Sequence, residues 1–116
     1  MTLRLDGILS KYVDSIAKVF GDKLDRVILF GSHAREDFSE NSDIDVMILV
    51  DMGDKELKKY LDDVVSITFD FNMDYDVNIS PILQEANHFN HWLPAIPFYQ
   101  NVMSEGTIIS IPFDLP

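Results

Sequence analysis

The sequence predicts an α/β (α+β) fold in which helices pack against a small, mixed β-sheet of three or four strands. Three observations support this prediction. Apolar residues recur at helical spacing over residues 5–20, short apolar runs follow at residues 26–30 and 46–50, and amphipathic segments then alternate with further short apolar runs. A chain of 116 residues has room for one hydrophobic core and is too small for two, so we expect a single domain over residues 1–116.

The first half of the chain predicts a helix, two strands and a turn between the strands. The helix is expected to end at Gly21, because glycine is favoured just past a helix C-terminus. Residues 26–30 (RVILF) and 43–50 (DIDVMILV) are expected as strands, and the second ends apolar on both faces, as a central, covered strand does. The apolar stripe of the helix consists of Leu5, Ile8, Leu9, Tyr12, Val13, Ile16, Val19 and Phe20.

The next segments predict an amphipathic helix, a third strand and another helix. The amphipathic segment begins at Asp54, and residues 74–80 (DYDVNIS) are expected as the third strand. Ser80 and Pro81 predict a helix start, since a hydroxyl caps a helix and proline favours its first turn. The positions of the amphipathic segment expected to face inward are Leu57, Tyr60, Leu61, Val64, Val65 and Thr68.

The C-terminal part combines a short helix with an aromatic-rich region. Residues 98–103 are expected as a helix that ends at Gly106, and residues 107–111 as a last strand before a loose tail. Two interpretations of the aromatic side chains stay open: core packing, or a surface that binds a partner, since exposed aromatics favour interfaces. These side chains are Phe89, Trp92, Phe98 and Tyr99.

Composition excludes several classes of protein. The net charge of −11 and the scattered basic residues argue against a nucleic-acid surface, so no direct nucleic-acid binding is expected. The sequence has no cysteine, which excludes disulfides, thiol catalysis and cysteine-bound zinc. No segment approaches a membrane span and the N-terminus does not resemble a signal peptide, so we expect a cytoplasmic protein. Three explanations of the acidic composition stay open: it keeps the domain soluble, it binds divalent cations, or it contacts a basic protein partner.

Asp43 and Asp45 form the first candidate site. Residues i and i+2 of a strand point to the same face, about 7 Å apart at the backbone, so both side chains can converge on one cation. Hard oxygen ligands without histidine or cysteine nearby suit Mg²⁺. The alternative is a solvated strand entrance, because an isolated Asp-x-Asp is a weak signal.

Gly31 and Ser32, at the exit of the first strand, add the features of a phosphate site. Glycine lets backbone N–H groups approach a ligand closely, Ser32 adds a hydroxyl, and a helical turn that begins there favours an anion. Arg35 lies one turn on, where its guanidinium can contact phosphate oxygens. Taken singly, these residues also fit a turn glycine, an N-cap serine and a surface arginine. Together with the carboxylates they match what a metal–nucleotide triphosphate requires, and the sequence has no P-loop or dinucleotide motif.

A two-metal site, in which one ion activates the attacking oxygen and the other holds the triphosphate, needs a third acid. We predict Asp76, because it begins the expected third strand on the side opposite Val77 and Ile79 and can meet the first pair across the sheet. Asp74 has the same parity and is the alternative, although it stands ahead of the strand proper.

Gly31-Ser32, ten further residues and Asp43-Ile44-Asp45 resemble the G-S-x10-D-x-D signature of the nucleotidyltransferase (DNA polymerase β-like) superfamily. The chain looks most like the minimal nucleotidyltransferases (MNT), the antitoxins of HEPN/MNT toxin–antitoxin pairs. The resemblance covers nearly the whole length and includes PFYQNVMSEGTII at residues 97–109. It implies the polymerase β-like palm fold.

The resemblance also implies a role for each matching residue. Gly31 and Ser32 would hold the triphosphate, Asp43 and Asp45 would bind both magnesium ions, and Asp76 would be the third carboxylate. The family often reads G-S-x-A-R-G-D, which Arg35 and Asp37 match. The sequence departs from the pattern at Glu36, where glycine is usual, and this adds a negative charge near the phosphates.

The implied activity is the Mg²⁺-dependent transfer of AMP from ATP to a hydroxyl, typically of a tyrosine, on a partner HEPN ribonuclease toxin. The chain has no room for an acceptor-binding domain, so we expect the acceptor to be small or to be delivered by another protein. Two alternatives stay open: a binding module that neutralises its partner by occlusion, and an enzyme that adenylylates a small molecule.

Overall fold

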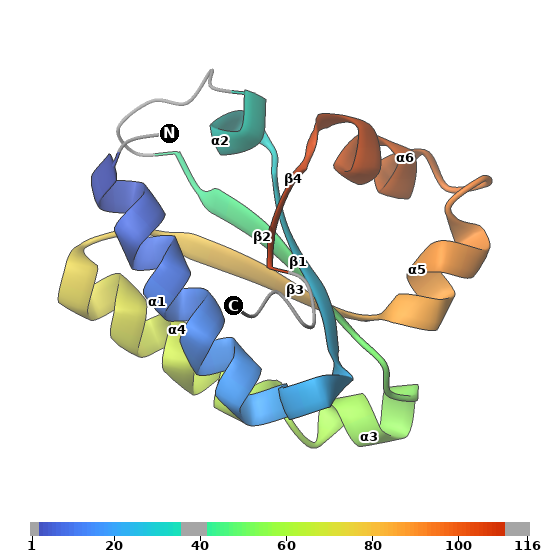
Figure 1. Cartoon of the computed structure of the whole chain (residues 1–116), viewed down its shortest axis with the longest axis horizontal. Helices are drawn as coiled ribbons and strands as arrows, with labels where there is room; N and C mark the ends of the chain where they lie inside the picture. The colour runs from blue at the N-terminus through green and yellow to red at the C-terminus, as the bar shows by residue number, and fades with distance from the viewer. Residues whose placement is uncertain (1–2, 36–41, 111–116) are drawn as a thin grey trace.

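The computed structural model describes residues 3–35 and 42–110, which form a four-stranded mixed sheet with helices on both faces (Figure 1). In chain order the elements are α1 (Leu3–Phe20), η1 (Gly21–Lys23), β1 (Leu24–Phe30), α2 (Ser32–Arg35), β2 (Ile44–Val50), α3 (Asp54–Lys58), α4 (Leu61–Tyr75), β3 (Ile79–Glu85), α5 (Ala86–Trp92), α6 (Pro97–Glu105) and β4 (Thr107–Ser110). The sheet order is β3-β2-β1-β4. β1 is antiparallel to β2 and β4, whereas β2 and β3 are parallel. The predicted fold class is confirmed.

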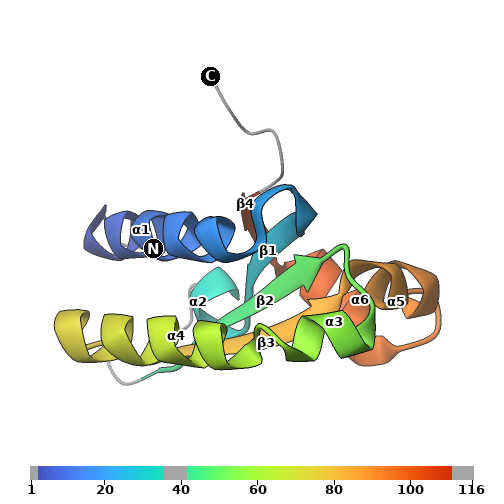
Figure 2. The ribbon, with the colours of Figure 1, turned by 90° about the horizontal axis from the view of Figure 1, so that it is seen from below.

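Two helix layers enclose the sheet. α1 and α4 lie side by side over one face, and α5 and α6 lie on the other side (Figures 1 and 2). Alternate residues of β2 enter the two cores: Val46 and Ile48 pack beneath α1 and α4, whereas Met47 and Leu49 pack beneath α5 and α6. β2 is therefore covered on both faces, as its apolar run predicted.

α1 confirms the helix predicted for the N-terminal segment. It ends at Phe20, and Gly21 follows with φ of +58°, a left-handed conformation in which glycine is not strained. The buried Tyr12 hydroxyl lies 2.8 Å from Thr68 Oγ1, which ties α1 to α4 inside the larger core. No helix of the described residues is long and apolar enough to cross a membrane.

The predicted third strand over residues 74–80 is wrong in its position. α4 continues through Tyr75, Asp76 follows at its C-terminus with φ of +53°, and β3 begins only at Ile79. Aspartate is among the few residues other than glycine that tolerate this conformation, so the helix ends without a glycine signal. Ser80 and Pro81 lie inside β3 and do not start a helix. β3 lies at an edge of the sheet, where a proline is tolerated.

α4 also corrects the predicted inward positions. Leu57, Val64 and Thr68 are buried as expected, but Leu61 and Val65 are exposed. Successive residues of a helix stand about 100° apart, so with Val64 turned into the core Val65 faces away from it. The exposed side chains form what we call the α4 stripe: Leu61 (46% exposed), Val65 (56%), Phe69 (63%) and Met73 (68%).

The C-terminal region confirms the predicted helix before Gly106, which is followed by β4. Residue 111, the last of the predicted strand, and the predicted tail lie outside the described residues. The aromatic side chains divide, because Phe89 and Tyr99 are buried whereas Trp92 and Phe98 are exposed.

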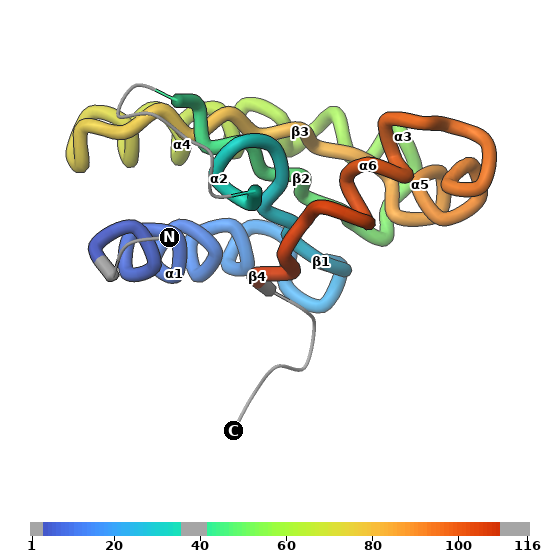
Figure 3. Tube along the Cα trace, turned by 90° about the horizontal axis from the view of Figure 1, so that it is seen from above, coloured from blue at the N-terminus to red at the C-terminus, as the bar shows by residue number. Residues whose placement is uncertain are grey.

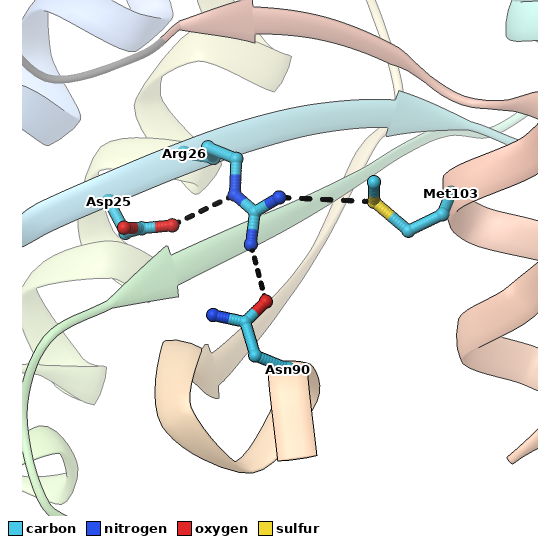
Figure 4. A network of polar contacts seen from close by, with 4 residues as sticks. All are labelled: Asp25, Arg26, Asn90 and Met103. Carbon is cyan, nitrogen blue, oxygen red and sulfur yellow. Dashed lines mark hydrogen bonds and ion pairs between the residues drawn. The ribbon is translucent and has the colours of Figure 1, made fainter. Parts of the chain in front are cut away.

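Arg26 of β1 connects this region to the sheet. Its guanidinium donates to Asp25 Oδ2 and Asn90 Oδ1, each at 2.8 Å, and contacts Met103 Sδ at 3.9 Å (Figure 4). Because Asn90 belongs to α5 and Met103 to α6, this one side chain contacts both helices from β1.

Candidate active site

The candidate site lies at one end of the sheet, where β1 ends and β2 begins. The antiparallel register places Phe30 opposite Asp45, so the Gly31–Ser32 turn and the Asp43–Asp45 pair are neighbours. α2 begins immediately after Gly31 and lies beside this end of the sheet (Figure 3). The structure thus brings the two ends of the predicted motif together.

Gly31 packs directly against a carboxylate. Its φ is +75°, and a Cβ added there would overlap Asp45 Oδ2 and lie 3.3 Å from Asp45 Cγ. Only glycine relieves both the backbone strain and the overlap. A larger residue at this position would therefore push the Asp45 carboxylate aside.

Asp45 lies in a strongly charged environment. Burial is the main cause that raises its pKa above the ordinary value, and the neighbouring negative charge of Asp43 raises it further. Coulombic interactions with the side chains of His33 and Arg35 act in the opposite direction and lower the pKa of Asp45. Two neighbouring carboxylates repel each other unless a cation neutralises them, and their oxygens are hard donors. Together with the space that Gly31 leaves beside Asp45, they fit a divalent cation such as Mg²⁺.

His33 is a further residue of the site, and no pattern in the sequence indicates it. It is buried, and its Nε2 lies 3.3 Å from the backbone oxygen of Ser42. The contact joins α2 to the residue just before Asp43 and so helps to fix the carboxylates relative to the turn. The sequence offers no signal for this role, because a lone histidine in a polar stretch resembles a surface residue.

Arg35 connects the site to α6. Its Nη1 lies 3.2 Å from Glu105 Oε2, and both side chains are more than one third exposed, so the pair adds little stability. Its backbone N–H donates to the Gly31 oxygen, which closes the helical turn predicted after the glycine. Glu36 and Asp37 lie outside the described residues.

The structure does not group Asp76 with the first pair as a metal-binding trio. Among residues 3–35 and 42–110, no three His, Cys, Asp or Glu side chains are grouped so that they could hold a metal ion. Asp76 follows the last turn of α4, and the alternative Asp74 is exposed within that turn. The register instead places Ser80 opposite Asp45, and the carbonyl of Asn78 accepts the Ile44 N–H at 2.8 Å. The role predicted for Asp76 stays a prediction.

Comparisons with known proteins agree with the motif. Residues 9–92 match the family model described as "Nucleotidyltransferase domain". Two similar proteins come from Methanocaldococcus jannaschii. "Putative protein adenylyltransferase MJ0141" is 44% identical over 78 residues, covering 66% of this chain and 75% of that protein. "Putative protein adenylyltransferase MJ0604" is 29% identical over 104 residues, covering 87% of this chain and 93% of that protein.

Two solved structures resemble the fold. One is a chain of a toxin–antitoxin crystal structure with AMP-PNP, with a TM-score of 0.51 and 16% identity over 86% of this chain and 71% of that one. The other belongs to a toxin–antitoxin structure described as a MntA-HpeT mutant, with the same TM-score and coverage and 14% identity. At these identities the likeness concerns the fold alone.

Proposed function

The chain belongs to the nucleotidyltransferase family, and we propose that it transfers AMP from ATP to a tyrosine hydroxyl of a partner HEPN-domain toxin and so acts as its antitoxin. The observation that carries the proposal is the packing of Gly31 against Asp45, which joins a phosphate-binding turn to a pair of cation-binding carboxylates. The names of the curated relatives support protein adenylylation, and the toxin–antitoxin neighbours support the kind of partner.

In this proposal each part of the site has one task. The backbone of Gly31 and the hydroxyl of Ser32 hold the triphosphate, and Arg35 neutralises part of its charge. Asp43 and Asp45 hold Mg²⁺, which when bound neutralises phosphate charge and makes the acceptor oxygen more nucleophilic. The acceptor oxygen forms a bond to the α-phosphorus, the bond from that phosphorus to the bridging oxygen breaks, pyrophosphate leaves, and the proton of the acceptor hydroxyl passes to water.

The surface of α4 supports a protein as the acceptor. The four side chains of the α4 stripe recur every fourth residue, so they form a continuous apolar strip on one helix face. Asp62, Asp63 and Asp70 are exposed on the same helix. An apolar strip bordered by acidic groups suits a partner whose own apolar surface carries basic residues, and this fits the net charge of −11.

The test is the double substitution Asp43→Asn with Asp45→Asn. With ATP labelled at the α-phosphate, Mg²⁺ and the HEPN partner, the wild type is expected to label the partner and the double variant to label none. Asparagine keeps the size of each side chain, so an unchanged thermal melt shows that the variant is folded. Full labelling by the folded double variant would show that the site lies elsewhere.

The same variant separates the enzyme from a binding module. A protein that neutralises its partner only by occlusion would still suppress the toxin after both substitutions, whereas the proposed enzyme would not. If the labelled product were a small molecule and the partner stayed unlabelled, the small-molecule alternative would replace the proposal.

A further inference from the structure

The register of β3 against β2 places the neutral residue Asn78 beside the Asp43–Asp45 pair, where a third acid was expected. We infer that the cation site of this chain is built from two carboxylates, Asp43 and Asp45, and the carboxamide of Asn78. The inference rests on the proposed function only in taking Asp43 and Asp45 as cation ligands.

The ladder between the two parallel strands fixes which residues are neighbours. Ile44 lies opposite Ile79, and both side chains are buried in the core beneath α1 and α4. Asp43 and Asn78 stand immediately before β2 and β3, so continued alternation of the side chains turns both, together with Asp45 and Ser80, to the other face. The Ile44 N–H donates to the Asn78 oxygen at 2.8 Å, so the ladder extends to Asn78. Asn78 is thus the register neighbour of Asp43, and it is exposed.

Asp76 is held by the helix and not by the strand. The N–H groups of Asp76 and Val77 both donate to the Asn72 oxygen, so these two residues continue the hydrogen bonding of α4. With φ of +53° at Asp76, the alternation of an extended strand does not reach back to it. The rule that every second residue of a strand faces the same way therefore groups residues 78 and 80 but does not include Asp76.

A second contact locks this register. The Asn72 side chain accepts the Ile79 N–H at 2.8 Å and donates to the Ile79 oxygen at 3.2 Å. This paired contact ties Ile79 to the last turns of α4, and it fixes where the strand begins. A slip of two residues, which would carry Asp76 to the position of Asn78, would break both hydrogen bonds.

An asparagine in place of a third acid changes the chemistry of the site. A carboxamide oxygen can ligate a hard cation, but it adds no charge and cannot accept a proton at neutral pH. The site therefore holds its cation with one negative charge fewer than a trio of carboxylates, and β3 offers no base at this position.

The experiment measures cation affinity without turnover. Mn²⁺ alone is titrated into the protein, and the paramagnetic resonance of the free ion reports binding, since Mn²⁺ takes the same oxygen ligands as Mg²⁺. Asn78→Asp is expected to tighten binding by at least about tenfold, because ligand charge sets the affinity of such sites. Asp76→Asn is expected to leave the affinity within about twofold.

Ser80→Asp is the comparison variant, because it adds the same charge two residues further along β3, opposite Asp45 instead of beside Asp43. It is expected to tighten binding less than Asn78→Asp does. The inference is overturned if Asn78→Asp leaves binding unchanged or weaker in a variant that melts like the wild type. It is equally overturned if Ser80→Asp has the larger effect, or if Asp76→Asn weakens binding tenfold or more.

This experiment separates the inference from the proposed function. If Asn78→Asp tightens Mn²⁺ binding but neither the wild type nor the variant transfers AMP to the partner, the proposed function fails and the composition of the site stands. If the wild type transfers AMP and Asn78→Asp leaves Mn²⁺ binding unchanged, the inference fails and the proposed function stands.

Discussion

Replacing Gly31 by alanine is expected to have two effects, a loss of stability from backbone strain and a loss of rate from displacement of the Asp45 carboxylate. At φ of +75°, alanine costs about 1–2 kcal/mol of stability, as left-handed residues other than glycine generally do. The added Cβ also overlaps the Asp45 carboxylate, which has to move away. A catalytic group displaced by about 1 Å costs on the order of 10²-fold in rate, so we expect a loss of AMP transfer of that size.

Gly21 provides the matched control. Its φ is +58°, and a Cβ added there meets nothing within 4 Å. Gly21→Ala therefore carries similar backbone strain without any contact to the site. Urea unfolding is expected to show a loss of about 1–2 kcal/mol in both variants, and labelled ATP to show a loss of rate in Gly31→Ala alone. If Gly31→Ala kept a rate within about threefold of the wild type, the rate of AMP transfer would not depend on the position of Asp45 against Gly31.

Two further predictions concern the partner surface and the core. Phe69→Glu, on the α4 stripe, is expected to weaken binding of the proposed HEPN partner by at least about tenfold in calorimetry, because it places a charge in the apolar strip. Trp92→Glu is expected to leave that affinity unchanged, and the opposite order of effects would place the interface at the aromatic region. Burial raises the pKa of Tyr12 to about 12 from an ordinary 10.0. A raised pKa stabilises the fold below pH 10 and loses this contribution as the pH rises toward 12, so between pH 9 and pH 11.5 the wild type should lose about 2 kcal/mol more than Tyr12→Phe in urea unfolding. Parallel pH profiles would contradict this.

Elements defined by local patterns could be predicted from the sequence. The apolar stripe of α1 has the helical period over its whole length, and Gly21 marks its end. β2 is apolar without interruption after Asp45, which indicates a strand covered on both faces. Gly31–Ser32 follows β1 and Asp43–Asp45 opens β2, and the antiparallel pairing that the structure shows between these strands brings the two pairs together.

Elements that depend on distant contacts could not be predicted. Ser80 and Pro81 suit a helix start and an edge strand equally well, and pairing with β2 decides for the strand. The start of that strand depends on the Asn72 side chain, which binds the backbone of Ile79. The contact of Arg35 with Glu105 joins residues 70 positions apart, and no local pattern indicates it.

The central claim is that the Gly31–Asp45 site transfers the nucleotidyl group of ATP. The most direct measurement compares ATP labelled at the α-phosphate with ATP labelled at the γ-phosphate, each incubated with the protein, Mg²⁺ and the proposed HEPN partner. We predict that the α label appears on a tyrosine of the partner and the γ label is released as pyrophosphate. Appearance of the γ label on the partner would contradict nucleotidyl transfer and indicate phosphorylation.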